Sequence, residues 1–328
     1  MLKMAKKLDY RPNLAARYLS SKRTLHISIN TLQGKTSFWD EVRAGIQEES
    51  RFLDLENVEL EFRTYPHLGE SEDAAFESAI KAGVDGILAF PSSPQNLKKF
   101  MRQTAAREIP LVFVATDAPG VAKLTVVSID TKASGFLAAD LMGRLLGKGR
   151  VAITMFDKKI TEHAEKGEAF ARTLKSYYPE MCVEDPIEDH DIESEAYEKT
   201  SRLIAAHPDL AGIYVTTEVS IPVIKAARDL GVLDRLVIVT TDLFPALAKE
   251  IKEGAVTATI YQRPRTQGRM AFRALYEYLV DGSFPRRRIT LAPHLVMRGN
   301  ADSFLQQDTS DLNEGEGEVA EFSGVAEP

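Results

Sequence analysis

The chain has 328 residues, with 41 Lys and Arg against 48 Asp and Glu, a net charge of −7 and 44% hydrophobic residues. This length and composition are typical of an ordinary globular protein with about two domains. No run of 18 or more apolar residues occurs, which excludes a membrane-spanning helix of the usual length. The single cysteine, Cys182, excludes an internal disulfide and a cysteine-rich metal site, and it is expected to be a small core residue.

Charge is distributed unevenly along the chain. Residues 1–23 carry seven basic side chains and one acidic one, whereas residues 306–328 carry seven acidic side chains and no basic one. A basic arm on an acidic body indicates that the arm meets a polyanion, although a solvated terminus without a partner explains the charge equally well. The Gly- and Glu-rich tail is predicted to be disordered. Because the first residues lack the apolar stretch of a secretory signal, a cytoplasmic location is expected.

Short apolar strands alternate with amphipathic helices from residue 25 onward. The predicted strands cover residues 25–30, 58–62, 83–90, 110–115, 125–130, 150–155, 181–184, 211–216 and 236–241. The predicted helices cover residues 38–53, 72–82, 96–107, 133–146, 165–178, 193–206 and 219–230. Such alternation is typical of parallel sheets with helices on both faces. Two cycles of the pattern predict an α/β protein with two lobes.

Ligands of such sheets lie at the carboxyl ends of the strands, so the residues that follow each strand are candidate site residues. They are polar and acidic, with one aromatic pair, and comprise Gln33, residues 37–39, Phe90, Thr116, Asp117, Asp130, residues 157–166, residues 216–218, Thr241 and Asp242. Carboxylates accept hydrogen bonds from sugar hydroxyls, and aromatic faces cover the apolar face of a sugar ring. Phe38 and Trp39 also fit a core role at the start of a helix.

Several motifs of catalysis and cofactor binding are missing. No Gly-rich phosphate loop, no Gly-x-Ser-x-Gly elbow and no plausible Cys/His pair occurs. Residues 189–191 and 162–163 lack the second cluster that a metal site needs, and both are interpreted as solvated loops. Asp117 and Asp242 are candidates for the two carboxylates of a sugar hydrolase, but hydrogen bonding to a ligand is their favoured role. The sequence therefore predicts a binding protein that is not an enzyme and uses no cofactor or metal.

Residues 3–19 resemble the end of the DNA-binding head and the hinge of the lactose-repressor (LacI/GalR) family of transcription regulators. The segment that carries the resemblance reads Tyr10-Arg11-Pro12-Asn13-Leu14-Ala15-Ala16-Arg17-Tyr18-Leu19. Pro12 breaks the preceding helix, and Asn13 is a good N-cap for a short one. The resemblance implies that Leu19 wedges into the minor groove of operator DNA, with Asn13, Ala16 and Arg17 near the DNA. Most of the family's helix-turn-helix head is missing from this sequence.

The resemblance continues to about residue 305. It rests on blocks at residues 128–130 with Gly135, 240–242, 259–262 and 292–298. It implies an effector domain similar to type 1 periplasmic sugar-binding proteins, with two Rossmann-like lobes joined by crossovers near Asp130, Gln262 and residues 290–292. The implied parts are residues 1–24 for the head end and hinge, 25–129 plus 263–289 for the N-terminal lobe, 130–262 plus 290–305 for the C-terminal lobe, and the tail 306–328.

The resemblance also implies a ligand site in the cleft between the lobes. Its residues are Gln33, Phe38, Trp39, Phe90, Asp117, His163, Lys166, Thr217, Asp242 and Gln262. Phe38 and Trp39 match the aromatic pair that stacks on sugars in ribose-type relatives, and Asp242 and Gln262 match residues that bind hydroxyls there. The pattern departs from the family at Ala115, where many relatives carry Asp. It also departs at His163 and Lys166, which stand where relatives often carry Arg.

The function implied by the resemblance is that of a ligand-responsive transcription regulator. A sugar or sugar derivative would bind in the cleft of a homodimer, and lobe closure would form or melt the hinge helices on operator DNA. The apolar faces of helices 72–82 and 94–108 are candidates for the dimer contact, although core packing explains them equally well. The alternative function is that of a stand-alone sugar-binding protein of a transport system.

Overall fold

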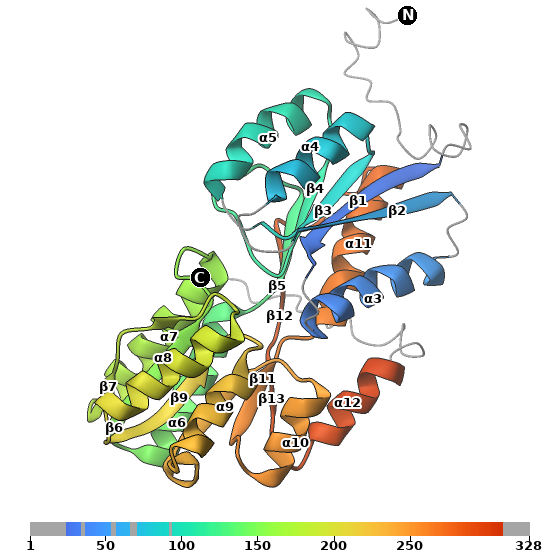
Figure 1. The fold of residues 1–328 in the computed structure, drawn as a ribbon. Coiled ribbons are helices and arrows are strands. Elements are labelled where there is room, and N and C mark those ends of the chain that lie inside the picture. The colour runs from blue at the N-terminus through green and yellow to red at the C-terminus, as the bar shows by residue number, and fades with distance from the viewer. Residues whose placement is uncertain (1–23, 34–36, 54–56, 66–70, 92–93, 311–328) are drawn as a thin grey trace, which may run out of the picture.

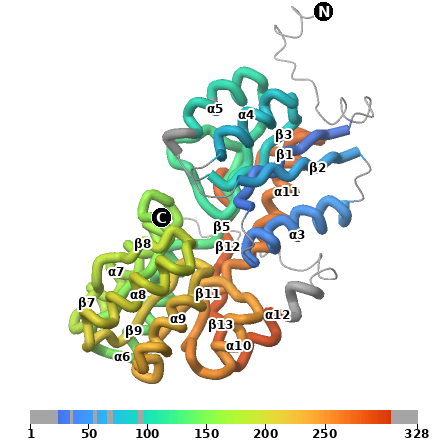
Figure 2. The backbone as a smooth tube through the Cα atoms, viewed as in Figure 1, coloured from blue at the N-terminus to red at the C-terminus, as the bar shows by residue number. Residues whose placement is uncertain are grey.

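The computed structural model describes residues 24–33, 37–53, 57–65, 71–91 and 94–310, which form two lobes (Figure 1; Figure 2). The sheet of the first lobe has six parallel strands in the order β12-β5-β4-β3-β1-β2. Its elements are β1 (Leu25–Leu32), α3 (Ser37–Phe52), β2 (Val58–Tyr65), α4 (Glu72–Ala82), β3 (Gly86–Ala89), α5 (Pro94–Ala106), β4 (Leu111–Val114), β5 (Thr125–Ile129), α11 (Pro264–Asp281) and β12 (Arg288–Leu291).

Helices cover both faces of this first sheet. Val42 and Ile46 of α3 share one hydrophobic cluster with Phe272 of α11, and a separate cluster on the other face contains Phe76 of α4 and Phe100 of α5. The apolar faces of α4 and α5 therefore contribute to the core, which is one of the two roles left open for them. The predicted α/β class with two lobes is confirmed.

The second lobe has a seven-stranded sheet in the order β13-β11-β10-β9-β6-β7, with β8 also paired to β6. Only β13 runs antiparallel to its neighbour among these described strands. The elements are α6 (Thr131–Leu146), β6 (Gly149–Met155), α7 (Thr161–Tyr177), β7 (Met181–Val183), β8 (Ile187–Glu188), α8 (Glu193–Ala206), β9 (Leu210–Val215), α9 (Ser220–Asp229), the short 3-10 helix η1 (Leu233–Arg235), β10 (Val237–Thr241), α10 (Pro245–Glu253), β11 (Ala258–Tyr261), β13 (His294–Val296) and α12 (Ala301–Ser310).

The chain passes between the lobes three times, from β5 to α6, from β11 to α11 and from β12 to β13. The sheet of the first lobe extends through Leu291, two residues beyond the boundary expected at 289, because Thr290 and Leu291 pair with Ser128 and Ile129 of β5. Figure 1 shows β5 and β12 together at the junction of the lobes.

Two further expectations are wrong. α12 extends to Ser310, five residues into the predicted disordered tail, because Phe304 packs against Tyr261 with 5.7 Å between ring centroids and Ala301 is fully buried. Cys182 is exposed, since β7 is the edge strand of its sheet, and it is therefore not a core residue. The hinge residues Asn13, Ala16, Arg17 and Leu19, the rest of residues 1–23, and residues 311–328 lie outside the described part of the chain.

Two glycines let α3 and α11 approach closely. A Cβ atom on Gly45 would lie 2.0 Å from the carbonyl oxygen of Arg265, and one on Gly268 would lie 2.1 Å from the carbonyl oxygen of Val42. Glu49, which is 1% exposed, pairs with Arg269 at 3.2 Å across the same contact. This packing holds the first turn of α3 at the mouth of the cleft. Across the described residues, no helix is both long and apolar enough to cross a membrane.

Candidate functional site

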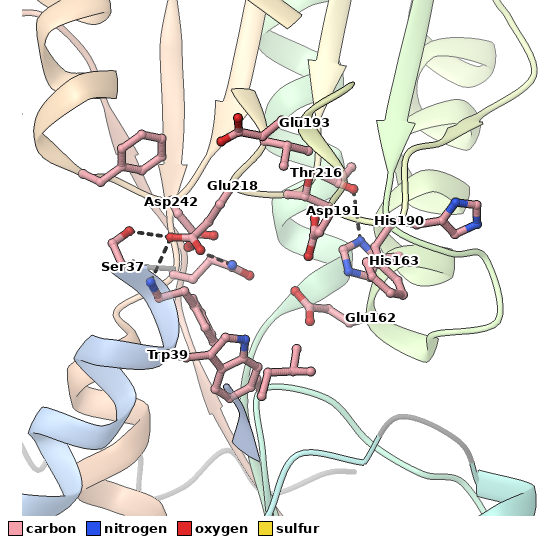
Figure 3. A pocket seen from close by; sticks show the side chains of 18 of the residues that line it. Ser37, Trp39, Glu162, His163, His190, Asp191, Glu193, Thr216, Glu218 and Asp242 are labelled. Atoms are coloured by element: carbon pink, nitrogen blue, oxygen red, sulfur yellow. Dashed lines mark hydrogen bonds between the residues drawn. The ribbon is translucent and has the colours of Figure 1, made fainter. Parts of the chain in front are cut away.

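A cavity of about 530 Å³ lies between the lobes, at the carboxyl ends of strands from both sheets (Figure 3). The first lobe lines it with Leu32, Ser37, Phe38, Trp39, Phe90 and Ala115. The second lobe lines it with Phe156, Glu162, His163, His190, Asp191, Glu193, Thr216, Thr217, Glu218, Val219, Ile221, Pro222, Asp242, Phe244 and Gln262. Its size is within the usual range for small-molecule sites.

Aromatic rings form the wall of the cavity that the first lobe supplies. The ring centroids of Phe38 and Trp39 are 4.9 Å apart, and those of Trp39 and Phe90 are 4.5 Å apart, both in edge-to-face geometry. Trp39 is only 6% exposed and belongs to the hydrophobic cluster of the first lobe, yet it also lines the cavity. The core role and the cavity role that the sequence left open for it are therefore both fulfilled.

Carboxylates dominate the opposite wall. Glu162 lies in the first turn of α7, Asp191 and Glu193 lie where β8 leads into α8, Glu218 follows β9 and Asp242 follows β10. All five line the cavity, and Figure 3 shows their side chains gathered across from Trp39. The second lobe thus presents hydrogen-bond acceptors to the aromatic wall of the first.

A buried network of side-chain hydrogen bonds holds two of these carboxylates in place. Lys166 is fully buried, and its Nζ donates to Glu162 Oε1 at 2.5 Å and to Gln262 Oε1 at 2.9 Å. Gln262 Nε2 in turn donates to Asp242 Oδ1 at 2.8 Å. Burial and the charge of Glu218 raise the pKa of the Asp242 carboxyl well above its usual range. This network fixes the orientation of Glu162, Gln262 and Asp242 toward the cavity.

His163 is a neutral member of the wall. Burial lowers the pKa of its imidazole to about 4, so it carries no charge at pH 7. Its Nδ1 lies 3.1 Å from Thr216 Oγ1, and that hydroxyl donates to the carbonyl of Thr154 at 3.0 Å. Because the hydroxyl proton is already used, we assign the hydrogen of the imidazole to Nδ1, which leaves Nε2 as an acceptor.

The turn at 189–191 is solvent-exposed at His190 and Asp191, as expected for a solvated loop, but these two residues also line the cavity. The backbone N–H of Asp189 donates to the Met155 carbonyl at 2.9 Å, and this bond continues the pairing of β8 with β6 and carries the segment to the cleft. Burial raises the pKa of Asp189 to about 7. Partial loss of hydration inside the cleft, with the charges of Asp189 and Glu218, raises the pKa of Asp191 to about 8.

A direct contact joins the two lobes beside the cavity. Glu218 Oε1 accepts a hydrogen bond of 2.8 Å from the backbone N–H of Phe38 and another from the Ser37 hydroxyl (Figure 3). Ser37 and Phe38 form the first turn of α3, whose N–H groups have no partner within the helix. A carboxylate at this helix end is favourable because the helix dipole places partial positive charge there.

Seven of the ten expected ligand residues line the cavity: Phe38, Trp39, Phe90, His163, Thr217, Asp242 and Gln262. Lys166 does not line the cavity but belongs to the buried hydrogen-bond network behind its wall. Gln33 is exposed and outside the lining, because its backbone N–H pairs with the Tyr65 carbonyl as an extension of β1. Asp117 is also outside, since Lys123 at 2.5 Å and Arg288 at 2.6 Å hold it at the rim of the first sheet. The hydrolase pair Asp117 and Asp242 therefore does not form across the cavity.

Of the five acidic residues that line the cavity, only Asp242 is among the ten expected ligand residues. Ser37, Glu162 and Glu218 stand at strand ends and were candidates by position, yet they were not among the ten. The sequence pattern predicts a loop at Glu162, whereas α7 begins at Thr161, four residues before the predicted helix. Asp191 follows a strand of only two residues, which is too short to show the alternation of apolar and polar side chains by which a strand is predicted. Among the described residues, no group of three His, Cys, Asp or Glu is arranged to hold a metal ion.

The fold is similar to that of solved sugar-binding proteins. A solute-binding protein of an ABC transporter from Burkholderia graminis, in complex with D-arabinose, has a TM-score of 0.80 and 21% identity and covers 86% of this chain and 98% of its own. A solute-binding protein from Agrobacterium vitis with bound D-fucose has a TM-score of 0.79 and 22% identity and covers 86% of this chain and 99% of its own. At this identity the likeness establishes the fold.

Curated relatives are of two kinds. The ribose import binding protein RbsB of Salmonella typhimurium is 23% identical over 246 residues, which cover 74% of this chain and 80% of the relative. Catabolite control protein A of Staphylococcus epidermidis is 21% identical over 305 residues, which cover 90% of this chain and 87% of the relative. The family described as periplasmic binding protein domain matches residues 28–283, most of the chain, so the protein belongs to that family.

Proposed function

We propose that this protein binds a sugar in the cleft between its lobes and that the lobes close around the sugar. The observation that carries the proposal is the composition of one cavity, in which the rings of Trp39 and Phe90 face a wall of carboxylates from the other lobe. Rings cover the apolar C–H face of a sugar, and carboxylates accept its hydroxyl protons. The relatives named for ribose, D-arabinose and D-fucose support the same ligand class.

The role of the site is binding and not reaction. The polar groups of the wall are held by each other: Lys166 and Glu162, Gln262 and Asp242, and Glu218 with the first turn of α3. Such a preorganised set of acceptors favours recognition of hydroxyl groups. These acceptor groups are already oriented before a ligand enters, which lowers the entropic cost of binding.

The test is a thermal-shift and calorimetry screen of the purified chain against D-ribose, D-arabinose, D-fucose, D-galactose and myo-inositol. A ligand at 100 times its Kd adds about 2.7 kcal/mol of stability, which raises the midpoint by roughly 5 °C at this size. Asp242→Asn is the sharpest variant, because asparagine tolerates the left-handed backbone at φ 71° and keeps the shape of the side chain. We expect it to weaken binding at least tenfold.

The matched control is Asp234→Asn, an exposed position of the second lobe outside the cavity. This control should bind as the native chain does. A flat screen on well-folded protein would refute sugar binding, and equal affinity of Asp242→Asn and the native chain would remove Asp242 from the site.

A regulatory role is a second candidate. Two observations favour it: residues 3–19 resemble the hinge of lactose-repressor regulators, and the alignment to catabolite control protein A is longer than the one to the ribose import protein. In this role the sugar would be an effector of a homodimer in the cytoplasm, and Asn13, Ala16, Arg17 and Leu19 would lie on DNA. The transport role has more support among the relatives, most of which are named as sugar-binding proteins of transport systems.

The DNA upstream of the Met1 codon separates the two roles. An in-frame helix-turn-helix there supports the regulator, and a secretion signal supports the transport protein. If the helix-turn-helix is found, the extended protein should bind a fluorescent duplex from its own promoter, with an affinity that the sugar changes at least tenfold. Arg17→Ala should weaken this binding, and Lys175→Ala, at an exposed site on α7, should not.

A further inference from the structure

We propose that the cleft selects an aminated sugar, that is, a hydroxylated ligand with one positive charge, over the neutral sugar of the same shape and over sugar acids and phosphates. The proposal rests on the sugar-binding function proposed above and names its ligand class. It is carried by two properties of the cavity wall, its formal charge and its balance of hydrogen-bond donors and acceptors.

The charge of the wall is one-sided. Five acidic side chains line the cavity, two of which (Asp191 and Asp242) have raised pKa values, and among its lining residues in the described part of the chain there is no Lys or Arg. The nearby Lys166 is fully buried behind the wall, where Glu162 and Gln262 accept its hydrogen bonds. The ammonium group of Lys166 is therefore paired directly with the carboxylate of Glu162 alone. A ligand with a positive charge is attracted to this wall, and a carboxylate or phosphate on a sugar is repelled by it.

Four donors of the wall are already used, whereas the buried Thr217 hydroxyl, which also lines the cavity, has no hydrogen-bond partner. The Ser37 hydroxyl and the Phe38 N–H donate to Glu218, Gln262 Nε2 donates to Asp242, and the assigned proton on His163 Nδ1 donates to Thr216. Apart from the Thr217 hydroxyl and the proton that Asp191 holds, these side chains offer acceptors, namely carboxyl oxygens and the Nε2 of a neutral imidazole. An ammonium group brings three donors and a charge, whereas the hydroxyl that it replaces brings one donor.

The opposite wall suits the same ligand. Trp39 and Phe90 present π-systems, which attract cations as well as the C–H face of a sugar ring. Aromatic rings on one side and carboxylates on the other give a positive charge favourable surroundings across the whole cavity. A neutral sugar satisfies the rings but brings no positive charge to the acidic side chains.

Asp191 is the expected partner of the amine. The acidic groups that act on it are Asp189 on the same turn, Glu218 after β9 and Glu162 on α7, and Glu193 lies two residues away. Loss of hydration in the cleft, together with these neighbours, raises its pKa to about 8, so the unliganded protein holds a proton there at pH 6.5. An ammonium group beside Asp191 favours the carboxylate, which predicts that the amine displaces this proton when it binds.

Calorimetry with matched ligands tests the proposal. The probes are D-glucosamine, D-galactosamine and D-mannosamine, each compared with its parent sugar and its N-acetyl form, with D-gluconate and D-glucose 6-phosphate as anions. We expect at least one amine to bind tenfold or more tightly than its parent, and the anions not to bind. Titrations at pH 6.5 in two buffers of different ionisation enthalpy should show release of close to one proton with the amine and none with its parent.

Asp191→Asn should reduce the ratio of the amine affinity to the parent affinity at least tenfold and abolish the proton release. Asp234→Asn, the exposed control, should change neither. If neutral sugars bind and their amines bind no better, this proposal fails and the sugar-binding function stands. Tightest binding of gluconate or glucose 6-phosphate also overturns it. If no sugar of any charge binds, the proposed function fails together with it.

Discussion

The carboxylate of Glu218 in the second lobe accepts a hydrogen bond of 2.8 Å from the backbone N–H of Phe38 in the first. The contact spans the cleft beside the cavity, so it requires the lobes to be close together. It uses an N–H group that α3 cannot pair internally, and the helix dipole strengthens it. Glu218 thus links the spacing of the lobes to the wall of the ligand site.

Removal of the Glu218 carboxylate is expected to open the unliganded protein. Glu218→Ala deletes the acceptor for both Ser37 and Phe38, so the lobes lose a charge-assisted contact. Small-angle X-ray scattering should give a larger radius of gyration for this variant than for the native chain. Glu180→Ala, at an exposed site of the same lobe, is the control. Identical scattering curves for Glu218→Ala and the native chain would contradict the role of the contact.

Lys166→Met is expected to destabilise the protein by about 3–5 kcal/mol, because it leaves Glu162 as a buried carboxylate without its cation. Chemical denaturation measures this change. Lys175→Met, at an exposed position of the same helix, should cost little. The double variant Lys166→Met/Glu162→Gln should recover much of the loss, and a double variant as unstable as the single one would show that the pair is not the cause.

Gly45→Ala is expected to cost about 1–3 kcal/mol by overpacking the contact of α3 with α11. The added methyl group would meet the Arg265 carbonyl oxygen at 2.0 Å, so the helices must move apart. Thermal unfolding should show a lower midpoint and, since α3 begins at the cleft, weaker ligand binding. Gly299→Ala places its methyl group in open space and is the neutral control. Equal midpoints for the two variants would contradict the close approach.

His163 is expected to make the protein sensitive to acid. The pKa of its imidazole is about 4 in the folded protein and about 6.5 in the unfolded chain. Between these values the unfolded chain binds more protons, so stability falls as the pH decreases from 6.5 to 4. His163→Gln should lose less stability over this range than the native chain does. A native pH profile for His163→Gln would refute the assignment.

The periodicity of the sequence predicts the fold well as far as residue 241. Alternating strands and helices of ordinary length carry the signal, and the rule that ligands lie at strand ends then places Trp39, Phe90 and Asp242 at the cleft. The elements after residue 241 were marked only by short blocks that resemble a family. No local pattern shows that α11 returns to the first lobe, since this depends on packing against α3.

The errors at the site have two physical causes. Asp117 stands at a strand end like the true site residues, but it is held by Arg288, which lies 171 positions away in the sequence. Asp191 was missed because its strand, β8, has only two residues, and such a strand is defined by its pairing with β6 and not by its own composition. Contacts between distant segments decide both cases, and one sequence without relatives does not contain them.

The division of the first lobe between both ends of the chain has a consequence for its synthesis. Phe272 and Leu275 of α11 complete the hydrophobic cluster over α3, yet they leave the ribosome after the strands from β6 to β11. The nascent first lobe therefore remains incomplete, with the apolar side of α3 uncovered, while most of the second lobe is translated. A chain arrested before residue 264 holds nearly a whole second lobe and an unfinished first one. Such intermediates are where chaperones bind and where aggregation begins.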